Sequence, residues 1–243
     1  MAQRRRKKQE KVSPVIWVSA ILAVALVVTV IVLAAKGMPD PTPTQPSTSG
    51  IHVEYSDADP IVLGQGLRIE RVGAYTGIFM ENGSNEAVTG TLMVILENAS
   101  PQDLQLARFS LSYADFTAEF EVTNLPAGQK TVVLEKNGRK ASGAPKSAKA
   151  STILFFQEKM TLMEGTLELN GQPGGIFVKN VSGKDISGNV WVYYKYSATD
   201  IFYGGITFRA KHTGGIKAGE SVMIPAAHYH PNSVKVVWVT VGA

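Results

Sequence analysis

Residues 175–196, GIFVKNVSGKDISGNVWVYYKY, combine an extended apolar start, a polar centre and an end rich in β-branched and aromatic residues. Val, Ile, Phe, Tyr and Trp favour strands, whereas Asn, Ser, Gly and Asp favour turns. The stretch therefore predicts two antiparallel strands joined by a turn. An earlier segment, GIFMEN at 77–82, matches GIFVKN at 175–180, which indicates a duplicated β unit.

The duplication predicts an alignment that continues from the two hexapeptides without a gap as far as Val94 and Val192. Beyond a seven-residue excess in the first copy, the alignment pairs two short Ala-Gly turns, each directly before an apolar strand pattern. A turn and strand in this position would close each sheet. The aligned positions are Ser84 with Ser182, Val88 with Ile186, Gly90 with Gly188, Leu92 with Val190, Val94 with Val192, and Ala127-Gly128 with Ala218-Gly219.

The remainder of the body, beyond residue 50, also has a β pattern. Short apolar runs are separated by Gly, Asn, Pro and Asp clusters every ~8–12 residues, a spacing typical of a sandwich or barrel. The glycines of 171–175 and 204–205 are interpreted as hairpin turns. Only residues 100–108 suggest a helix, because Ser100 is a favourable N-cap and Pro101 fits the first helical position.

The second copy resembles the small Ig-like β-sandwich repeats of bacterial envelope proteins, in particular the FxLYD-type pattern. The first copy departs from that pattern, since Gln129-Lys130 replaces Glu-Ser and Leu96-Glu97 replaces the aromatic position. The resemblance implies an all-β fold of two tandem Ig-like antiparallel sandwiches and little about activity. The residues that carry it are Asn180, Ser182, Ile186, Val190, Val192 and Tyr194, followed by Ala218-Gly219-Glu220-Ser221.

The N-terminal segment predicts a membrane anchor. Its apolar part, residues 14–35, is 22 residues long and would span about 33 Å as a helix, enough for a ~30 Å hydrocarbon core. The Arg/Lys cluster before it predicts a cytoplasmic N-terminus and an extracytoplasmic body at the cell membrane. A cleaved signal peptide is the alternative, although the apolar stretch exceeds the usual ~7–15 residues.

This organisation divides the chain into five parts. Residues 1–13 are the basic tail and 14–36 the single-pass signal anchor, while 37–50 form a Pro/Thr/Ser stalk with extended backbone. The two predicted β-sandwich repeats cover 51–158 and 159–243.

Charge and cysteine content limit the possible functions and the cell compartment of the protein. Seven of the 24 basic residues but only two of the 20 acidic ones lie in residues 1–50, so the nearly neutral body gives no reason to expect nucleic-acid binding. The absence of Cys from an exported chain favours a bacterial envelope. In a eukaryotic secretory protein, the Asn-x-Ser sequons at Asn82, Asn98 and Asn180 would be glycosylation acceptors.

Three of the four histidines form the candidate metal site. His228 and His230 would lie on one face of a strand, and with His212 or Glu220 they could hold Zn²⁺ or Cu²⁺. A polar turn before Pro231 is the simpler interpretation. The sequence has no Gly-x-Ser-x-Gly elbow and no phosphate-binding loop, so we expect a protein that is not an enzyme and has no cofactor.

An aromatic cluster in the second copy is the candidate partner-binding surface. Alternate residues of a strand lie on opposite faces, so one set must be core and the other can be exposed for a protein or glycan. Burial of both faces is the competing interpretation. The candidate residues are Trp191, Tyr193, Tyr194, Tyr196, Phe202 and Tyr203.

Three hypotheses for the whole chain follow from the sequence. The first is a membrane-anchored interaction module that binds an envelope protein or a cell-wall or host glycan. The second is a small metal-dependent enzyme built on the histidines. The third is a scaffold that acts through its membrane helix. An isopeptide crosslink from Lys179 or Lys195 to Asn189 or Asn232 is a further possibility within the body.

Overall fold

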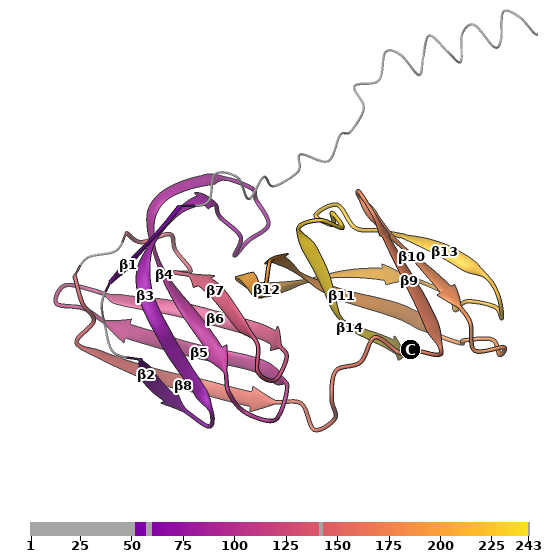
Figure 1. The fold of residues 1–243 in the computed structure, drawn as a ribbon, viewed down its shortest axis with the longest axis horizontal. Helices are drawn as coiled ribbons and strands as arrows, with labels where there is room; N and C mark the ends of the chain where they lie inside the picture. Colours follow the sequence, from indigo (N-terminus) through magenta and orange to yellow (C-terminus); the bar gives the residue numbers. More distant parts are fainter. Residues whose placement is uncertain (1–51, 57–59, 141–142, 243) are drawn as a thin grey trace, which may run out of the picture. The chain divides into compact units, whose positions relative to one another are not determined.

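The computed structural model describes residues 52–56, 60–140 and 143–242, all within one compact unit of the chain, residues 43–243 (Figure 1). These residues form strands joined by turns and loops, and no helix occurs among them. The predicted all-β class is therefore confirmed for this region. The strands are β1 (His52–Ser56), β2 (Ile61–Gly64), β3 (Leu67–Ile78), β4 (Ala87–Asn98), β5 (Leu104–Ser112), β6 (Thr117–Leu125), β7 (Lys130–Leu134), β8 (Ser147–Phe155), β9 (Leu167–Gln172), β10 (Gly175–Asn180), β11 (Asn189–Ala198), β12 (Ile201–His212), β13 (Ser221–Pro225) and β14 (Val234–Gly242).

The strands form three sheets. The largest has eight strands in the order β1-β3-β4-β7-β12-β11-β14, with β2 paired to β3. The other two have three strands each, in the orders β6-β5-β8 and β13-β10-β9. β7 and β12 pair in parallel, whereas the other strand pairs of these sheets are antiparallel. The large sheet therefore continues from the first half of the sequence into the second.

The same connection of strands occurs twice. In the first half β4 pairs with both β3 and β7, while β5 pairs with both β6 and β8. In the second half β10 pairs with β9 and β13, while β11 pairs with β12 and β14. We call β3–β8 the first copy and β9–β14 the second copy. By this correspondence β4 is equivalent to β10, and β5 to β11.

This equivalence overturns the predicted alignment of 77–82 with 175–180. The second segment is strand β10, but the first covers the end of β3 and the loop that follows it. Strand β4 instead ends at Asn98 as β10 ends at Asn180. The GIF similarity is misleading because a short apolar motif reflects strand composition and does not define the place of the strand in the topology. The predicted pairing of Ala127-Gly128 with Ala218-Gly219 agrees with the topology, since each turn leads to the strand that joins β4 or β10.

A buried asparagine organises the turn after β4. The Asn98 side-chain amide donates to the carbonyl oxygens of Gln102 (2.9 Å) and Leu125 (3.0 Å). Its Oδ1 accepts the Ser100 backbone N–H at 3.2 Å. In the same turn the Asp103 carboxylate accepts the Ala127 N–H at 2.8 Å. The motif Asn-x-Ser-x-x-Asp therefore joins this turn to the loop that precedes β7.

The second copy repeats this hydrogen-bond set. Asn180 donates to the carbonyl oxygens of Lys184 (2.7 Å) and Ile216 (2.9 Å), and its Oδ1 accepts the Ser182 N–H at 3.0 Å. The carboxylate of Asp185 accepts the Ala218 N–H at 2.9 Å.

This hydrogen bonding also affects two of the predicted glycosylation acceptors. Asn98 and Asn180 are fully buried and their amide nitrogens already donate twice. They are therefore structural residues and not accessible acceptors.

The helix predicted over 100–108 is wrong. Ser100 does accept a backbone N–H as an N-cap would, from Gln102 at 2.9 Å, but it closes a turn. From Leu104 onward the chain is strand β5, which pairs with β6 and β8. Leu104, Phe109 and Leu111 are buried between the sheets. The burial of apolar side chains in the sheet therefore outweighs the local preference of Ser100 and Pro101 for a helix start.

Two apolar clusters fill the space between layers, as expected of β-sandwich packing. Residues of β3, β4, β5, β6 and β7 form the first cluster, together with Phe202 and Val237 of the second copy. The second cluster combines β10, β11, β12, β13 and β14 with Tyr75, Met93 and Leu134 of the first copy. Both faces of β4 and β7 are therefore buried, which explains their nearly continuous apolar sequence.

The expected tail, anchor and stalk at 1–13, 14–36 and 37–50 lie outside the described residues. Within the part of the chain that is described, no helix is long and apolar enough to cross a membrane.

Replacing Asn180 by Ala tests the role of the buried amide. The variant removes the amide donors to Lys184 and Ile216, whose carbonyl oxygens each keep one other donor, and leaves the Ser182 N–H without its acceptor. We therefore expect the free energy of unfolding to fall by about 2 kcal/mol. Urea denaturation of residues 43–243 measures it, and Asn98→Ala should give a similar loss. The matched control is Asn232→Ala, at an exposed position, with an expected change within about 0.5 kcal/mol. Equal losses for Asn180→Ala and this control would contradict the role of the motif.

Candidate functional site

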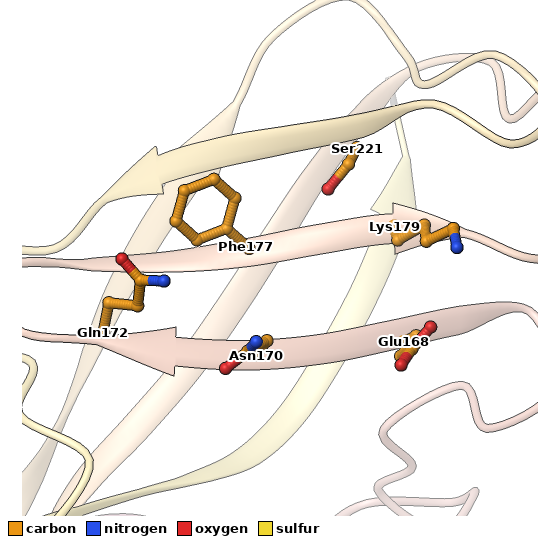
Figure 2. Close-up of a pocket in the computed structure, with 6 residues that line it drawn as sticks. All are labelled: Glu168, Asn170, Gln172, Phe177, Lys179 and Ser221. Atoms are coloured by element: carbon orange, nitrogen blue, oxygen red, sulfur yellow. The ribbon is translucent and has the colours of Figure 1, made fainter.

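The outward face of β9, β10 and β13 forms a shallow hollow of about 300 Å³ (Figure 2). Strand alternation places its side chains: Ile176 and Val178 point into the core, while Phe177 and Lys179 point outward. Phe177 lies between Gln172 at one end of the hollow and the charged residues Glu168 and Lys179 at the other. The lining residues are Glu168, Asn170, Gln172, Phe177, Lys179 and Ser221.

The strand register arranges this face in rows. In the central row, Asn170 and Met223 lie opposite Phe177 on the two flanking strands. Glu168 and Ser221 lie opposite Lys179 in the next row. Met223, on the edge strand β13, is a large apolar side chain that is 52% exposed. The surface therefore has an apolar centre with polar groups around it.

A glycine forms the floor of the third row. Gly175 lies opposite Gln172 on β9 and Pro225 on β13. A Cβ atom at Gly175 would lie 3.0 Å from the Met223 sulfur, so even Ala would have to displace that side chain. The absence of a side chain at this position keeps the hollow open beside Phe177.

The equivalent face of the first copy is closed. When Asn98 is aligned with Asn180, Met93 corresponds to Gly175. When the two Ala-Gly turns are aligned, Leu134 corresponds to Pro225. All four equivalent apolar residues, Met93, Ile95, Val132 and Leu134, are buried in the cluster that includes the core of the second copy. The face that packs protein in the first copy is therefore an open, hollowed surface in the second.

Three of the six aromatic residues proposed for binding belong to the core. Tyr194, Tyr196 and Phe202 are each 5% or less exposed. Tyr194 packs edge-on against Tyr229, with ring centroids 5.6 Å apart. Burial raises the pKa of the Tyr194 hydroxyl to about 12. Tyr194 and Tyr196 stabilise the core of the second copy, whereas Phe202 packs in the cluster of the first, so none of the three can contact a partner.

The other three proposed aromatic residues are partly buried. Tyr193 stacks on Trp238 at 4.6 Å, and Tyr203 packs against the second cluster. Trp191 lies under two cations, with the Arg209 guanidinium carbon 5.0 Å and the Lys211 Nζ 4.8 Å from the ring centroid. Such contacts shield the indole ring. The predicted aromatic surface is therefore largely occupied by its own neighbours.

The three histidines have separate contacts. The Nε2 of His212 lies 2.9 Å from the Gly215 carbonyl oxygen, and the His228 ring packs on Phe208 at 4.9 Å. The Nδ1 of His230 accepts the Asn232 N–H at 3.4 Å. Among the described residues, no group of three or more His, Asp or Glu side chains is arranged to hold a metal ion. The geometry gives no support to the metal hypothesis.

A partly buried carboxylate joins the two copies. Glu81, in the loop after β3, accepts the backbone N–H groups of Leu134 (2.9 Å), Gly205 (2.8 Å) and Ile206 (3.3 Å). Burial raises the pKa of the Glu81 carboxyl, an effect opposed by these N–H groups and by Lys195. The loop therefore connects the end of β7 to the start of β12.

Lys195 is fully buried beside this junction. Its ammonium donates to the carbonyl oxygens of Gly205 (2.7 Å), Ile206 (2.8 Å) and Thr123 (3.2 Å). Burial lowers the pKa of Lys195 to about 7, and the nearby Glu81 carboxylate acts in the opposite direction. The hydrogen-bond partners of Nζ are backbone oxygens and a threonine hydroxyl, so this geometry does not favour an isopeptide bond to an asparagine.

Sequence reasoning missed the hollow face. It interpreted the glycines of 171–175 and 204–205 as hairpin turns. The structure confirms a hairpin turn at 173–174, between β9 and β10, but Gly204 and Gly205 lie within β12. The usable signal was the alternation of Glu168, Asn170 and Gln172 with less exposed residues, opposite an outward Phe177.

Comparisons of the chain with models of protein families, with curated proteins and with solved structures find no match. The function is therefore argued from the described geometry.

The lowered pKa of Lys195 predicts a pH dependence of stability. Between about pH 7 and its usual value of 10.5, the native state binds fewer protons at Lys195 than the unfolded chain does. Stability should therefore rise from pH 7 to pH 9, by up to about 1.4 kcal/mol per pH unit. Urea denaturation of residues 43–243 at these pH values measures the slope.

Lys195→Met should abolish this slope, whereas Lys235→Met, at the exposed position opposite it on β14, should keep it. A slope that survives Lys195→Met would contradict the assignment. The measurements end at pH 9 because burial raises the pKa of Tyr113 and Tyr194 from 10.0 to about 12. Above about pH 10 the native state therefore binds more protons at these tyrosines than the unfolded chain does, and stability falls as the pH rises.

Proposed function

We propose that this chain is a membrane-anchored, extracytoplasmic interaction or scaffold module of the bacterial cell envelope, and that it binds a protein or glycan partner through a β-sandwich surface. The basic tail, the 22-residue apolar segment and the Pro/Thr/Ser stalk support the membrane anchor and its orientation. The all-β body supports a role in presenting a surface, because a rigid sheet holds exposed side chains in fixed positions.

We infer that the body is two tandem Ig-like sandwich repeats. The strand connections support this, since each copy joins its sheets through the same order of pairings. The hydrogen-bond sets of Asn98 and Asn180, with the carboxylates of Asp103 and Asp185, provide independent support. Two unrelated sandwiches would have no reason to share a buried amide and a carboxylate-to-loop hydrogen bond at equivalent turns.

The hollow on β9, β10 and β13 is the observation that carries the binding proposal. It has an outward aromatic ring at its centre, an exposed methionine beside it and polar groups around both. Exposed apolar groups surrounded by polar ones are typical of binding sites.

A small metal-dependent enzyme is the alternative that the sequence raised. It would need His212, His228 and His230 to converge, and their separate contacts do not favour it. The scaffold version, in which the membrane helix alone acts, predicts that function survives deletion of residues 51–243.

Site-specific photocrosslinking tests the binding face. A photoreactive amino acid in place of Phe177 should give discrete adducts in intact cells that carry the chain. The same amino acid in place of Leu154, which is 48% exposed on β8, is the matched control and should give none. Equal labelling at both positions, or no adduct at 177, would contradict binding through this face.

Metal analysis tests the alternative. We expect less than about one-tenth of an equivalent of zinc or copper in the purified full chain, because each histidine is engaged separately. Stoichiometric metal that is lost on His228→Ala would overturn the interaction proposal in favour of the enzyme.

A further inference from the structure

We propose that the hollow on β9, β10 and β13 binds an uncharged glycan strand that contains N-acetylated sugars. This inference rests on the proposed function, since it names the partner of that same face. It is argued from the aromatic centre, the polar groups, the charge balance and the contrast with the first copy.

Phe177 supplies a platform for a sugar ring. It is centred in the face, with Asn170 on one side and Met223 on the other. The ring belongs to a strand that is paired on both edges, so the backbone that carries it is held in place before a ligand arrives. An aromatic face packs against apolar C–H groups, while polar neighbours bond to the hydroxyls around them.

The polar groups match hydroxyl and acetamido chemistry. The side-chain amides of Asn170 and Gln172 each offer both donors and an acceptor, and both residues are exposed. An acetamido group likewise has one N–H, one carbonyl oxygen and a methyl group. Met223 and Pro225 lie on β13, across β10 from the two amides, and provide apolar contact for such a methyl group.

The charge balance favours an uncharged ligand. The face has one carboxylate, Glu168, and one ammonium, Lys179, directly opposite each other in the register. A polyanion would meet the carboxylate, and a polycation the ammonium. Neighbouring charges of both signs instead suit a ligand that offers hydroxyls as donors and acceptors.

The first copy argues against a packed protein domain as the occupant. There the same face presents Met93, Ile95, Val132 and Leu134, which are buried against protein. In the second copy Gly175 corresponds to the first of these side chains, and this removes bulk from one end of the face. The three rows extend over ~13 Å along the strands, which suits a short oligosaccharide.

Titration with soluble chito-oligosaccharides tests the proposal. The full chain is purified in a detergent without a sugar headgroup, and binding is measured by calorimetry. We expect saturable binding of the N-acetylglucosamine tetramer that weakens about tenfold or more in Phe177→Ala. Phe177→Trp should retain binding, Asn170→Ala should weaken it, and Leu154→Ala is the unaffected control. If Phe177→Ala fails to fold, Asn170→Ala and Phe177→Trp decide the result.

Each outcome has a definite meaning. No binding of the tetramer, or binding that Asn170→Ala and Phe177→Ala leave unchanged, overturns the glycan inference. If the tetramer fails while position 177 still crosslinks to an envelope protein, the glycan inference is wrong and the interaction proposal stands. If neither the tetramer binds nor position 177 crosslinks, both are wrong.

Discussion

Where β7 and β12 pair in parallel, two buried or partly buried charged side chains extend a short backbone ladder. The Glu81 carboxylate accepts the N–H groups of Leu134, Gly205 and Ile206, and the Lys195 ammonium donates to carbonyl oxygens on the same stretch of β12. The backbone pairing of β7 with β12 covers only Thr131 with Phe202 and Val132 with Tyr203. A buried backbone group without a hydrogen-bond partner costs about 1–3 kcal/mol, so the side-chain contacts are most important just beyond these pairs. The continuous eight-stranded sheet depends on this junction.

The junction also decides which faces of the two copies remain open. Because the large sheet continues through β7 and β12, the outer face of the first copy is buried in a cluster with the core of the second. The equivalent face of the second copy has no such neighbour among the described residues, and there Phe177 and Met223 reach the surface. The same strand connection thereby has two roles, with the first copy as support and the second as the candidate binding surface.

Several elements could be predicted from local sequence, and their errors share a cause. The strands around 175–180 and 190–196 follow from β-branched and aromatic residues, and the structure confirms them. The helix at 100–108 and the alignment of 77–82 with 175–180 were wrong, because cap residues and short apolar motifs are judged without their partners. Asn98 shows the point: its sequence suggests a sequon, while its burial and its hydrogen bonds to Leu125 make it structural.

The sequence by itself determined the all-β class, most of the strands and the near-neutral charge of the body, since these depend on composition and on the two-residue period of strands. Only the tertiary structure decided which side chains are accessible. Tyr194 and Phe177 are both aromatic residues in strands of the second copy, yet one is buried and the other lines the hollow. The difference depends on which sheets and loops cover each face, and that is set by contacts between residues far apart in the chain.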